Sequence, residues 1–157
     1  MKSYFVMCAV LAALIMTPGY GATAASRDAD AQSLNANEMQ WNQEYAAKDL
    51  DKIMAHYSDD ASVMAPGMPS AAGKKAIRQL LKGMLEDPAL SLKFHATKVE
   101  VSKSGDMAFT QGSYTMTMTD PSSKKIITDH GSYVTTYRKL ANGSWKAVAD
   151  IATSERQ

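Results

Sequence analysis

Residues 107–140 read MAFTQGSYTMTMTDPSSKKIITDHGSYVTTYRKL and are the most informative part of the chain. Two long runs, Met107 to Thr119 and Lys125 to Leu140, alternate apolar or aromatic residues with small polar ones. Alternation with a period of two is typical of a β-strand with one buried face. Between the runs, Asp120-Pro121-Ser122-Ser123 favours a turn. The stretch therefore predicts two antiparallel strands.

The same period continues on both sides of this hairpin. Upstream, Leu92, Phe94, Ala96 and Lys98 alternate with Lys93, His95, Thr97 and Val99, and Ser104-Gly105-Asp106 predicts a tight turn. Downstream, Ala141-Asn142-Gly143-Ser144 is typical of a hairpin and precedes a last strand over residues 145–153. Four sequential strands joined by short turns predict an antiparallel meander.

The first half of the chain has helical periodicity instead. Apolar residues recur at helical spacing over residues 34–47 and 74–86. Asp49 is a good N-cap for a short helix between them, which we expect to extend to Tyr57 and to end at the turn Ser58-Asp59-Asp60. Residues 26–37 predict a frayed lead-in, and residues 61–65 a brief strand. The expected fold class is α+β, with three helices packed on one face of the sheet.

The N-terminus has the pattern of a secretory signal peptide. Lys2 precedes an unbroken apolar run from Tyr4 to Met16, which is too short to span a membrane. Pro18-Gly19 and a series of small residues follow, and Ala22-Thr23-Ala24 fits the cleavage rule. We expect cleavage after Ala24, with Ala25 as the alternative. This predicts a signal peptide over residues 1–24, a single domain over residues 25–157, and a periplasmic or secreted protein.

Charge and cysteine content exclude several classes of function. The full chain has 17 Lys and Arg against 16 Asp and Glu, and removal of Lys2 with the signal peptide leaves the mature chain neutral. We therefore expect no nucleic-acid partner and no stable membrane insertion after signal cleavage. The only cysteine, Cys8, also lies in the signal peptide, so disulfide and thiol chemistry are not expected.

Short motifs along the chain resemble the nuclear transport factor 2-like superfamily. In the first half they are Asp49-Leu50-Asp51, Tyr57 to Val63, and Gly73-x-x-Ala76-Ile77. In the second half they are Gly105-Asp106-x-Ala108, Gly112-x-Tyr114, Gly131-x-Tyr133 and Asn142-Gly143-x-Trp145-Lys146. The chain is most similar to the ketosteroid-isomerase-like and polyketide-cyclase-like group of unassigned function. The resemblance implies a strongly curved sheet wrapped around helices as a cone with a central cavity, in a homodimer.

The same resemblance argues against ketosteroid isomerase activity. That mechanism needs a carboxylate base together with a tyrosine and a protonated carboxyl that stabilise the oxyanion. The positions that match them hold Ala65, Trp41, and Thr135 or Thr136. None of these side chains can replace the group that the mechanism requires.

Asp150 is the candidate acid or base in this chain. It shares a strand face with Val148, Ala152 and Ser154, and the resemblance implies that this face looks into the cone. A partly desolvated carboxylate there could act in catalysis with a tyrosine such as Tyr57 or Tyr133. The alternative is a structural acid that is hydrogen-bonded to a neighbouring tyrosine or to the backbone.

The histidines give no further candidate. Asp129 and His130 are adjacent on a strand and therefore point to opposite faces. His56 and His95 show no ligand spacing with any acid, so we expect neither a metal site nor a cofactor.

Aromatic, methionine and polar side chains could together line a mostly apolar cavity. The predicted ligand-binding residues are Trp41, Tyr45, Tyr57, Met64, Tyr114, Met116, Tyr133, Thr135 and Asp150. Three hypotheses stay open: an exported protein that binds a small apolar or aromatic molecule, a cofactor-free isomerase, dehydratase or cyclase using Asp150, and a dimeric interaction module with a filled cone.

Overall fold

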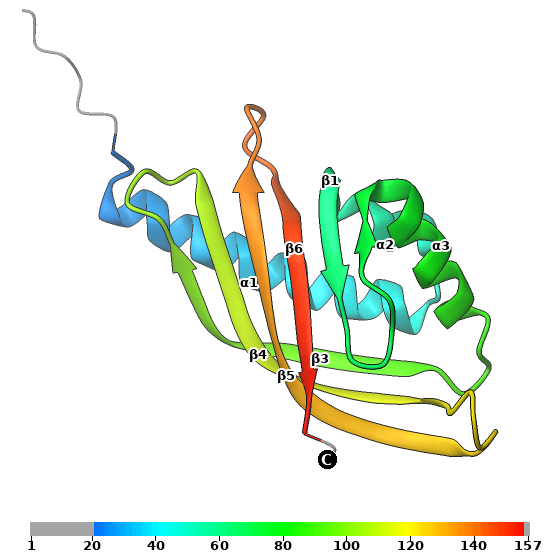
Figure 1. The fold of residues 1–157 in the computed structure, drawn as a ribbon. Coiled ribbons are helices and arrows are strands. Elements are labelled where there is room, and N and C mark those ends of the chain that lie inside the picture. The colour runs from blue at the N-terminus through cyan, green and yellow to red at the C-terminus, as the bar shows by residue number, and fades with distance from the viewer. Residues whose placement is uncertain (1–20, 156–157) are drawn as a thin grey trace, which may run out of the picture.

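The computed structural model describes residues 21–155. Residues 1–20 of the predicted signal peptide lie outside this range. In chain order the elements are α1 (Ala24–Ala46), α2 (Leu50–Ala55), β1 (Tyr57–Met64), β2 (Ala71–Ala72), α3 (Gly73–Leu85), β3 (Ser91–Val101), β4 (Met107–Thr119), β5 (Ile126–Lys139) and β6 (Trp145–Ser154) (Figure 1).

The strands form one six-stranded sheet in the order β2-β1-β6-β5-β4-β3. Strands β3 to β6 pair antiparallel with their chain neighbours, which confirms the meander. The sequence did not indicate that β1 lies parallel to β6, with Val63 opposite Asp150. This pairing joins the two halves of the chain and carries β1 and β2 into the same sheet as the meander.

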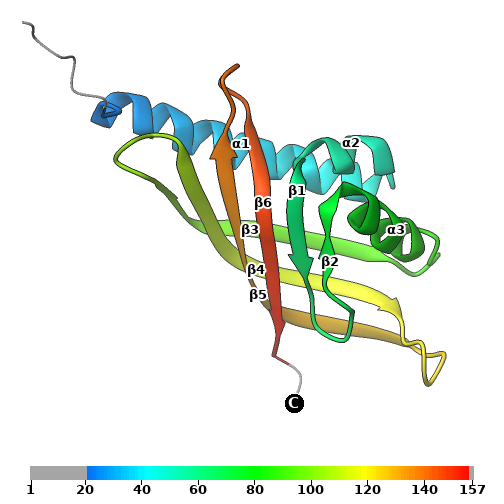
Figure 2. The ribbon, with the colours of Figure 1, turned by 45° about the horizontal axis from the view of Figure 1, so that its top comes forward.

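The helices pack on a curved sheet, as expected for the α+β class. Figures 1 and 2 show α1 crossing behind the strands, while α2 and α3 lie beside β1 and β2 at the other end of the sheet. The long strands β3, β4 and β5 bend beneath α3 in both views, so the sheet curves around one side of the helices.

Helix α1 begins earlier than the sequence predicted. Residues 26–37 are helical, so the expectation of a frayed lead-in was wrong. The Thr23 side chain accepts a hydrogen bond of 3.1 Å from the backbone N–H of Ser26 and caps the helix. Further along, Lys139 on β5 forms an ion pair of 2.5 Å with Asp30. The alanine content of this segment favours a helix, and contacts with the sheet hold it in place.

The junction between α2 and β1 also differs from the prediction. Asp49 caps α2 as expected, since its side chain accepts from the backbone N–H of Lys52 at 3.2 Å. Tyr57, however, is the first residue of β1, and Ser58-Asp59-Asp60 continues the strand instead of turning. Tyr57 lies opposite Ala147 of β6. Pairing with a strand 90 residues away in the chain outweighs the local turn preference.

A β-bulge in β3 reverses the face of its second half. The register shifts between Ala96 and Lys98, so Val99 and Val101 pack against the core. Lys98 instead faces outward and pairs with Glu100 at 3.2 Å. The predicted grouping of Lys98 with Leu92 and Phe94 was therefore wrong.

Asn42 fastens α1 to β3, the edge strand of the sheet. Its amide oxygen accepts from the backbone N–H of Phe94 at 2.9 Å, and its amide nitrogen donates to the Phe94 carbonyl at 2.6 Å. The side chain thus takes the place of a neighbouring strand. This covers part of an edge that would otherwise present free backbone groups.

Candidate ligand-binding cavity

A cavity opens between the inner face of the sheet and helices α1 and α3. Its volume is about 100 Å³, of the same order as a cavity of about 150 Å³ that binds benzene. All nine residues proposed from the sequence are part of its wall: Trp41, Tyr45, Tyr57, Met64, Tyr114, Met116, Tyr133, Thr135 and Asp150. The sequence analysis did not select several apolar wall residues, among them Leu81, Met84 and Phe94.

Two glycines position two of the cavity tyrosines. Gly112 on β4 lies opposite Tyr133 on β5, and Gly131 on β5 lies opposite Tyr114 on β4. A Cβ atom at Gly131 would come within 2.7 Å of the Tyr114 ring, and one at Gly112 within 2.8 Å of the Tyr133 ring. Each ring therefore packs directly over the backbone of the other strand. The repeated Gly-x-Tyr pattern in the sequence is explained by this exchange.

Asp150 supplies the only carboxylate in the cavity wall of the described structure. Its Oδ2 accepts a hydrogen bond of 2.8 Å from the Tyr57 hydroxyl, and its Oδ1 accepts one of 3.0 Å from Thr135. Burial raises the pKa of Asp150, the two hydroxyl donors act against this rise, and the nearby Glu38 charge adds to it. The three side chains come from β6, β1 and β5, which the sheet order places side by side.

Tyr45 and Tyr57 belong to the same group of polar side chains. Burial, and then the charge of Asp150, raise the pKa of the Tyr57 hydroxyl well above its usual value. The same two causes raise the pKa of Tyr45, and the Tyr57 hydroxyl partly offsets them. Both phenols therefore stay protonated at neutral pH.

Glu38 on α1 is a buried acid that the sequence analysis missed. Its carboxylate accepts hydrogen bonds from the hydroxyls of Thr110, Tyr133 and Tyr137, the last at 3.1 Å. Only 3% of the residue is exposed. Its position could have revealed it, because Glu38 falls at helical spacing between the apolar residues Leu34 and Trp41. An acid on the buried face of a helix requires hydrogen-bond donors.

Asp129 is a second buried acid behind the cavity wall. It accepts a hydrogen bond of 2.7 Å from the Tyr114 hydroxyl and one of 2.6 Å from Ser154. The adjacent His130 is exposed on the other face, where its Nδ1 lies 3.0 Å from the Thr115 hydroxyl. Asp129 and His130 therefore do not form a dyad, as the strand geometry predicted.

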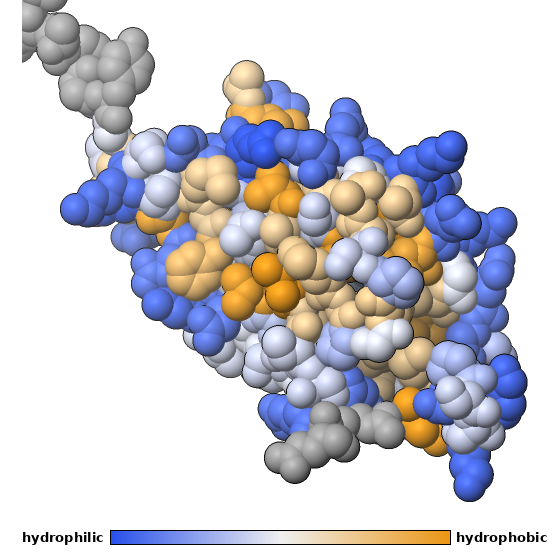
Figure 3. Space-filling model, in the orientation of Figure 1, coloured by the Kyte–Doolittle hydropathy of each residue, from blue (hydrophilic) through white to orange (hydrophobic). Residues whose placement is uncertain are grey.

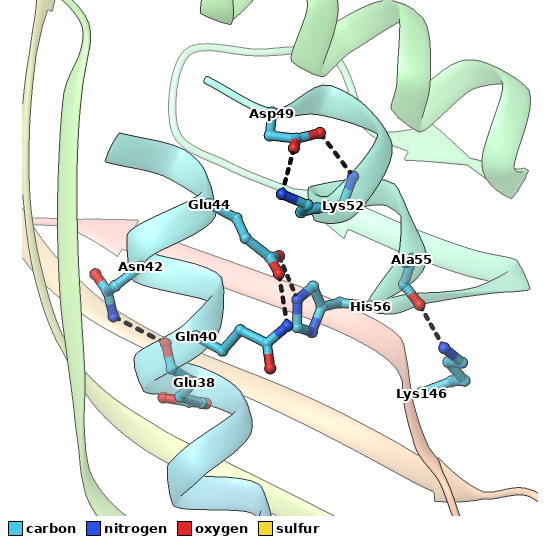
Figure 4. A network of polar contacts seen from close by, with 9 residues as sticks. All are labelled: Glu38, Gln40, Asn42, Glu44, Asp49, Lys52, Ala55, His56 and Lys146. Atoms are coloured by element: carbon cyan, nitrogen blue, oxygen red, sulfur yellow. Dashed lines mark hydrogen bonds and ion pairs between the residues drawn. The ribbon is translucent and has the colours of Figure 1, made fainter. Parts of the chain in front are cut away.

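His56 has an acidic partner, contrary to the sequence analysis. Its Nε2 lies 2.6 Å from Oε2 of Glu44, and both side chains are 7% exposed (Figure 4). The His56 ring also stacks on Trp41, with ring centroids 4.7 Å apart. Burial lowers the pKa of His56, although the Glu44 carboxylate acts against this. The pair joins α1 to the end of α2, and spacing in the sequence could not show it because the two helices meet at an angle.

The positions matched to the ketosteroid isomerase mechanism contain no acid or phenol in the structure. Ala65 and Trp41 are both in the cavity wall, and Thr135 donates to Asp150. The Trp41 indole nitrogen is buried and has no hydrogen-bond partner within the described residues. The acid of this cavity, Asp150, thus lies on β6, whereas Ala65 directly follows β1.

Clustered metal ligands and membrane-spanning helices are both absent from residues 21–155. This part of the chain contains no group of three or more His, Cys, Asp or Glu side chains that could hold a metal ion. None of its helices is long and apolar enough to cross a membrane.

Comparison with solved structures places this architecture among nuclear transport factor 2-like proteins. A ketosteroid isomerase-like protein from Erwinia carotovora atroseptica is 21% identical, with a TM-score of 0.66, over 80% of this chain and 96% of that one. A nuclear transport factor 2-like superfamily protein from Salmonella enterica is 15% identical, with a TM-score of 0.70, over 83% and 94%. A hexachlorocyclohexane dehydrochlorinase is 14% identical, with a TM-score of 0.68, over 82% and 88%.

The helix-covered curved sheet therefore has the fold of these nuclear transport factor 2-like structures. Residues 39–148 match the model of the SnoaL-like domain, and the chain belongs to that family. No curated protein matches the sequence. The resemblance and the fold class inferred from the sequence are confirmed.

Proposed function

We propose that this protein binds a small, largely apolar or aromatic molecule in its cavity. The observation that carries the proposal is the composition of the wall. Aromatic and aliphatic side chains make up most of it, and Asp150 with its two hydroxyl donors forms one polar anchor. An apolar pocket with a few convergent polar groups is typical of small-molecule sites.

A binding role fits the way Asp150 is held. Both of its oxygens accept hydrogen bonds from protein hydroxyls, an arrangement that keeps the carboxylate in place in the absence of a ligand. The positions of the ketosteroid isomerase mechanism also contain no replacement for its base or its oxyanion donors. We therefore expect no ketosteroid isomerase activity.

The experiment is the binding of the neutral apolar dye N-phenyl-1-naphthylamine to the mature protein. Entry into an apolar cavity should increase its fluorescence. Ala152→Trp should abolish the increase, because Ala152 lines the cavity and the larger ring would fill it. Thr153→Trp is the matched control, since the neighbouring residue is exposed on the opposite face. Equal dye binding by both variants would show that the dye binds elsewhere, and no binding by the unaltered protein would refute the proposal.

The second candidate is a proton-transfer enzyme that uses Asp150. The raised pKa of this carboxylate is the observation that favours it, because a general base works best when its pKa approaches the operating pH. One structural neighbour is named as a dehydrochlorinase, and an elimination of that kind needs a base to remove a proton. Asp150→Asn separates the two candidates: ligand binding should survive in a binding protein, whereas turnover in an enzyme should collapse.

Export and dimerisation complete the proposal. We expect cleavage after Ala24 and a periplasmic or secreted protein, which the N-terminal sequence and mass of the protein purified from its own host would test.

For the dimer, the outer face of the sheet is the favoured interface. Phe109 and Val134 are partly exposed there, and Ile151 is 38% exposed. Apolar side chains gather on this side of the molecule in Figure 3.

Native mass spectrometry measures the oligomeric state and any retained ligand together. Ile151→Glu should convert a dimer to a monomer, because the charge would be buried in the interface. Lys125→Glu, at an exposed turn residue, is the control. A monomeric unaltered protein would refute the dimer without affecting the cavity.

A further inference from the structure

The cavity wall has a one-sided charge. Among the described residues that line it, Asp150 is the only Asp or Glu, and no Lys, Arg or His lines it. The basic side chain packed behind Trp41 is His56, which is held by Glu44 and has a lowered pKa. It therefore adds little positive charge at neutral pH. No basic group in the wall balances Asp150.

Four of the five side-chain hydroxyl groups in the wall donate to carboxylates, and Tyr45 is the fifth. Tyr57 and Thr135 donate to Asp150, Tyr133 donates to Glu38, and Tyr114 donates to Asp129. A hydroxyl has a single hydrogen to donate, so these four groups can only accept further hydrogen bonds. The Trp41 indole nitrogen is itself buried and does not face the open space. Apart from Tyr45, the polar side chains that line the cavity therefore offer acceptors to a ligand.

Two further carboxylates lie directly behind the tyrosines. Glu38 and Asp129 are both almost fully buried, and only hydroxyl groups donate to their side chains. Neither forms an ion pair within the described residues. Together with Asp150 they give the cavity a negative potential that the protein does not neutralise internally.

The aromatic rings of the wall also favour a positively charged ligand. Six aromatic residues line the cavity, namely Trp41, Tyr45, Tyr57, Phe94, Tyr114 and Tyr133. The face of an aromatic ring attracts a cation, and such contacts strengthen when water is excluded. Carboxylates behind a partly aromatic wall are therefore better suited to a positive than to a negative ligand.

From these observations we infer that the ligand is an organic cation, a protonated amine or quaternary ammonium on an apolar or aromatic body. Its charge lies toward Asp150, and its body lies against the rings of α1 and the sheet. The inference rests on the proposed binding function and names the chemical class of its ligand.

The test compares three probes with the same phenyl ring and two-carbon chain: 2-phenylethylamine, 2-phenylethanol and 3-phenylpropionate. At pH 7.5 they are a cation, a neutral molecule and an anion, and each competes with N-phenyl-1-naphthylamine on the mature protein. A charge-assisted contact and cation–π contacts should make the amine bind about 10- to 100-fold more tightly than the alcohol. The carboxylate should bind most weakly.

Asp150→Asn keeps the shape of the side chain and removes its charge, so it should reduce the preference of the cavity for the amine over the alcohol to about threefold or less. Asp51→Asn is the control, because this carboxylate on α2 is 84% exposed and outside the wall. It should leave the preference unchanged. If Asp150→Asn does not fold, the order of the three probes on the unaltered protein still decides.

Two failures can be told apart. If the dye binds and the amine competes no better than the alcohol or the carboxylate, or does not compete, the cavity binds apolar molecules and the cation inference is wrong. If the dye does not bind to the unaltered protein, the proposed function itself fails, and the inference fails with it.

Discussion

The most direct test of the buried polar group is Glu38→Gln. The substitution keeps the volume of the side chain and replaces one acceptor oxygen by an NH₂ group, which can only donate. In the native protein Oε1 accepts from Thr110 and Tyr137, and Oε2 accepts from Tyr133. Glutamine can keep its oxygen toward the first two hydroxyls. Its NH₂ group then faces the Tyr133 hydroxyl, which loses its acceptor.

The magnitude follows from these three bonds. A hydrogen bond to a charged group contributes about 1.5–3 kcal/mol and a neutral one about 1 kcal/mol. Two weakened bonds and one lost bond therefore cost about 4 kcal/mol. Removing a buried charge offsets about 1–2 kcal/mol of this. We expect the free energy of unfolding to fall by about 2–3 kcal/mol.

The assay is urea unfolding at pH 7.5, followed by tryptophan fluorescence and circular dichroism. With a urea dependence of about 1.5–2 kcal/mol per molar, the midpoint should fall by about 1–2 M. Glu100→Gln is the control, because this acid is 53% exposed in a surface ion pair and should change stability by less than about 0.5 kcal/mol. Tyr133→Phe should cost less in the Glu38→Gln background than alone, since the bond it removes is already lost.

A midpoint equal to or above that of the unaltered protein would refute the reasoning. It would mean that the cost of burying the Glu38 charge equals or exceeds the contribution of its three hydroxyl bonds. Equal costs of Tyr133→Phe in both backgrounds would show that Tyr133 and Glu38 do not act together.

Three further predictions concern other parts of the structure. Because burial lowers the pKa of His56 below 6.5, the unfolded chain binds a proton first as the pH falls, and stability should decrease below about pH 6.5. His56→Gln should reduce this loss in urea unfolding between pH 7 and 5, and an unchanged pH dependence would contradict it. Gly131→Ala should destabilise by about 2–4 kcal/mol, because the added Cβ would meet the Thr153 carbonyl oxygen at 2.0 Å and the Tyr114 ring. It should also weaken dye binding, whereas Gly143→Ala, at a hairpin with open space around it, should only strain a turn of positive φ. Asn42→Ala leaves the N–H and C=O of Phe94 without their partner and should cost about 1–3 kcal/mol. Hydrogen exchange at Phe94 should accelerate, and continued protection of that amide would refute the role of Asn42.

The secondary structure was largely predictable because most of its signals are local. The alternation over residues 107–119 and 126–139 and the hairpin at Asn142-Gly143 depend on neighbouring residues, and the structure agrees with them. The amphipathic pattern of α3 was predicted within one residue at each end. One error is the lead-in over residues 26–37, which is helical. The others lie at Tyr57 and at Lys98, where pairing between strands decides the conformation or the face.

The candidate site was predictable as a set of side chains but not as a set of contacts. The residues that share a strand face follow from the period of two, and only the family resemblance implied that the face of Asp150 looks into the cone. The sequence could not predict which acid accepts a hydrogen bond from which hydroxyl, because partners such as Glu38 and Tyr133 are 95 residues apart in the chain. Glu44 and His56 likewise meet only because α1 and α2 pack together.

The sequence by itself determined the family, the α+β class and the residue types available to a cavity, because these depend on local periodicity and on short motifs. The tertiary structure alone decided that β1 joins the sheet beside β6, and that Glu38, Asp129 and Asp150 accept hydrogen bonds from hydroxyl groups of the wall. Such contacts form between segments distant in the chain, and their geometry is set by packing and by the need to satisfy buried polar groups.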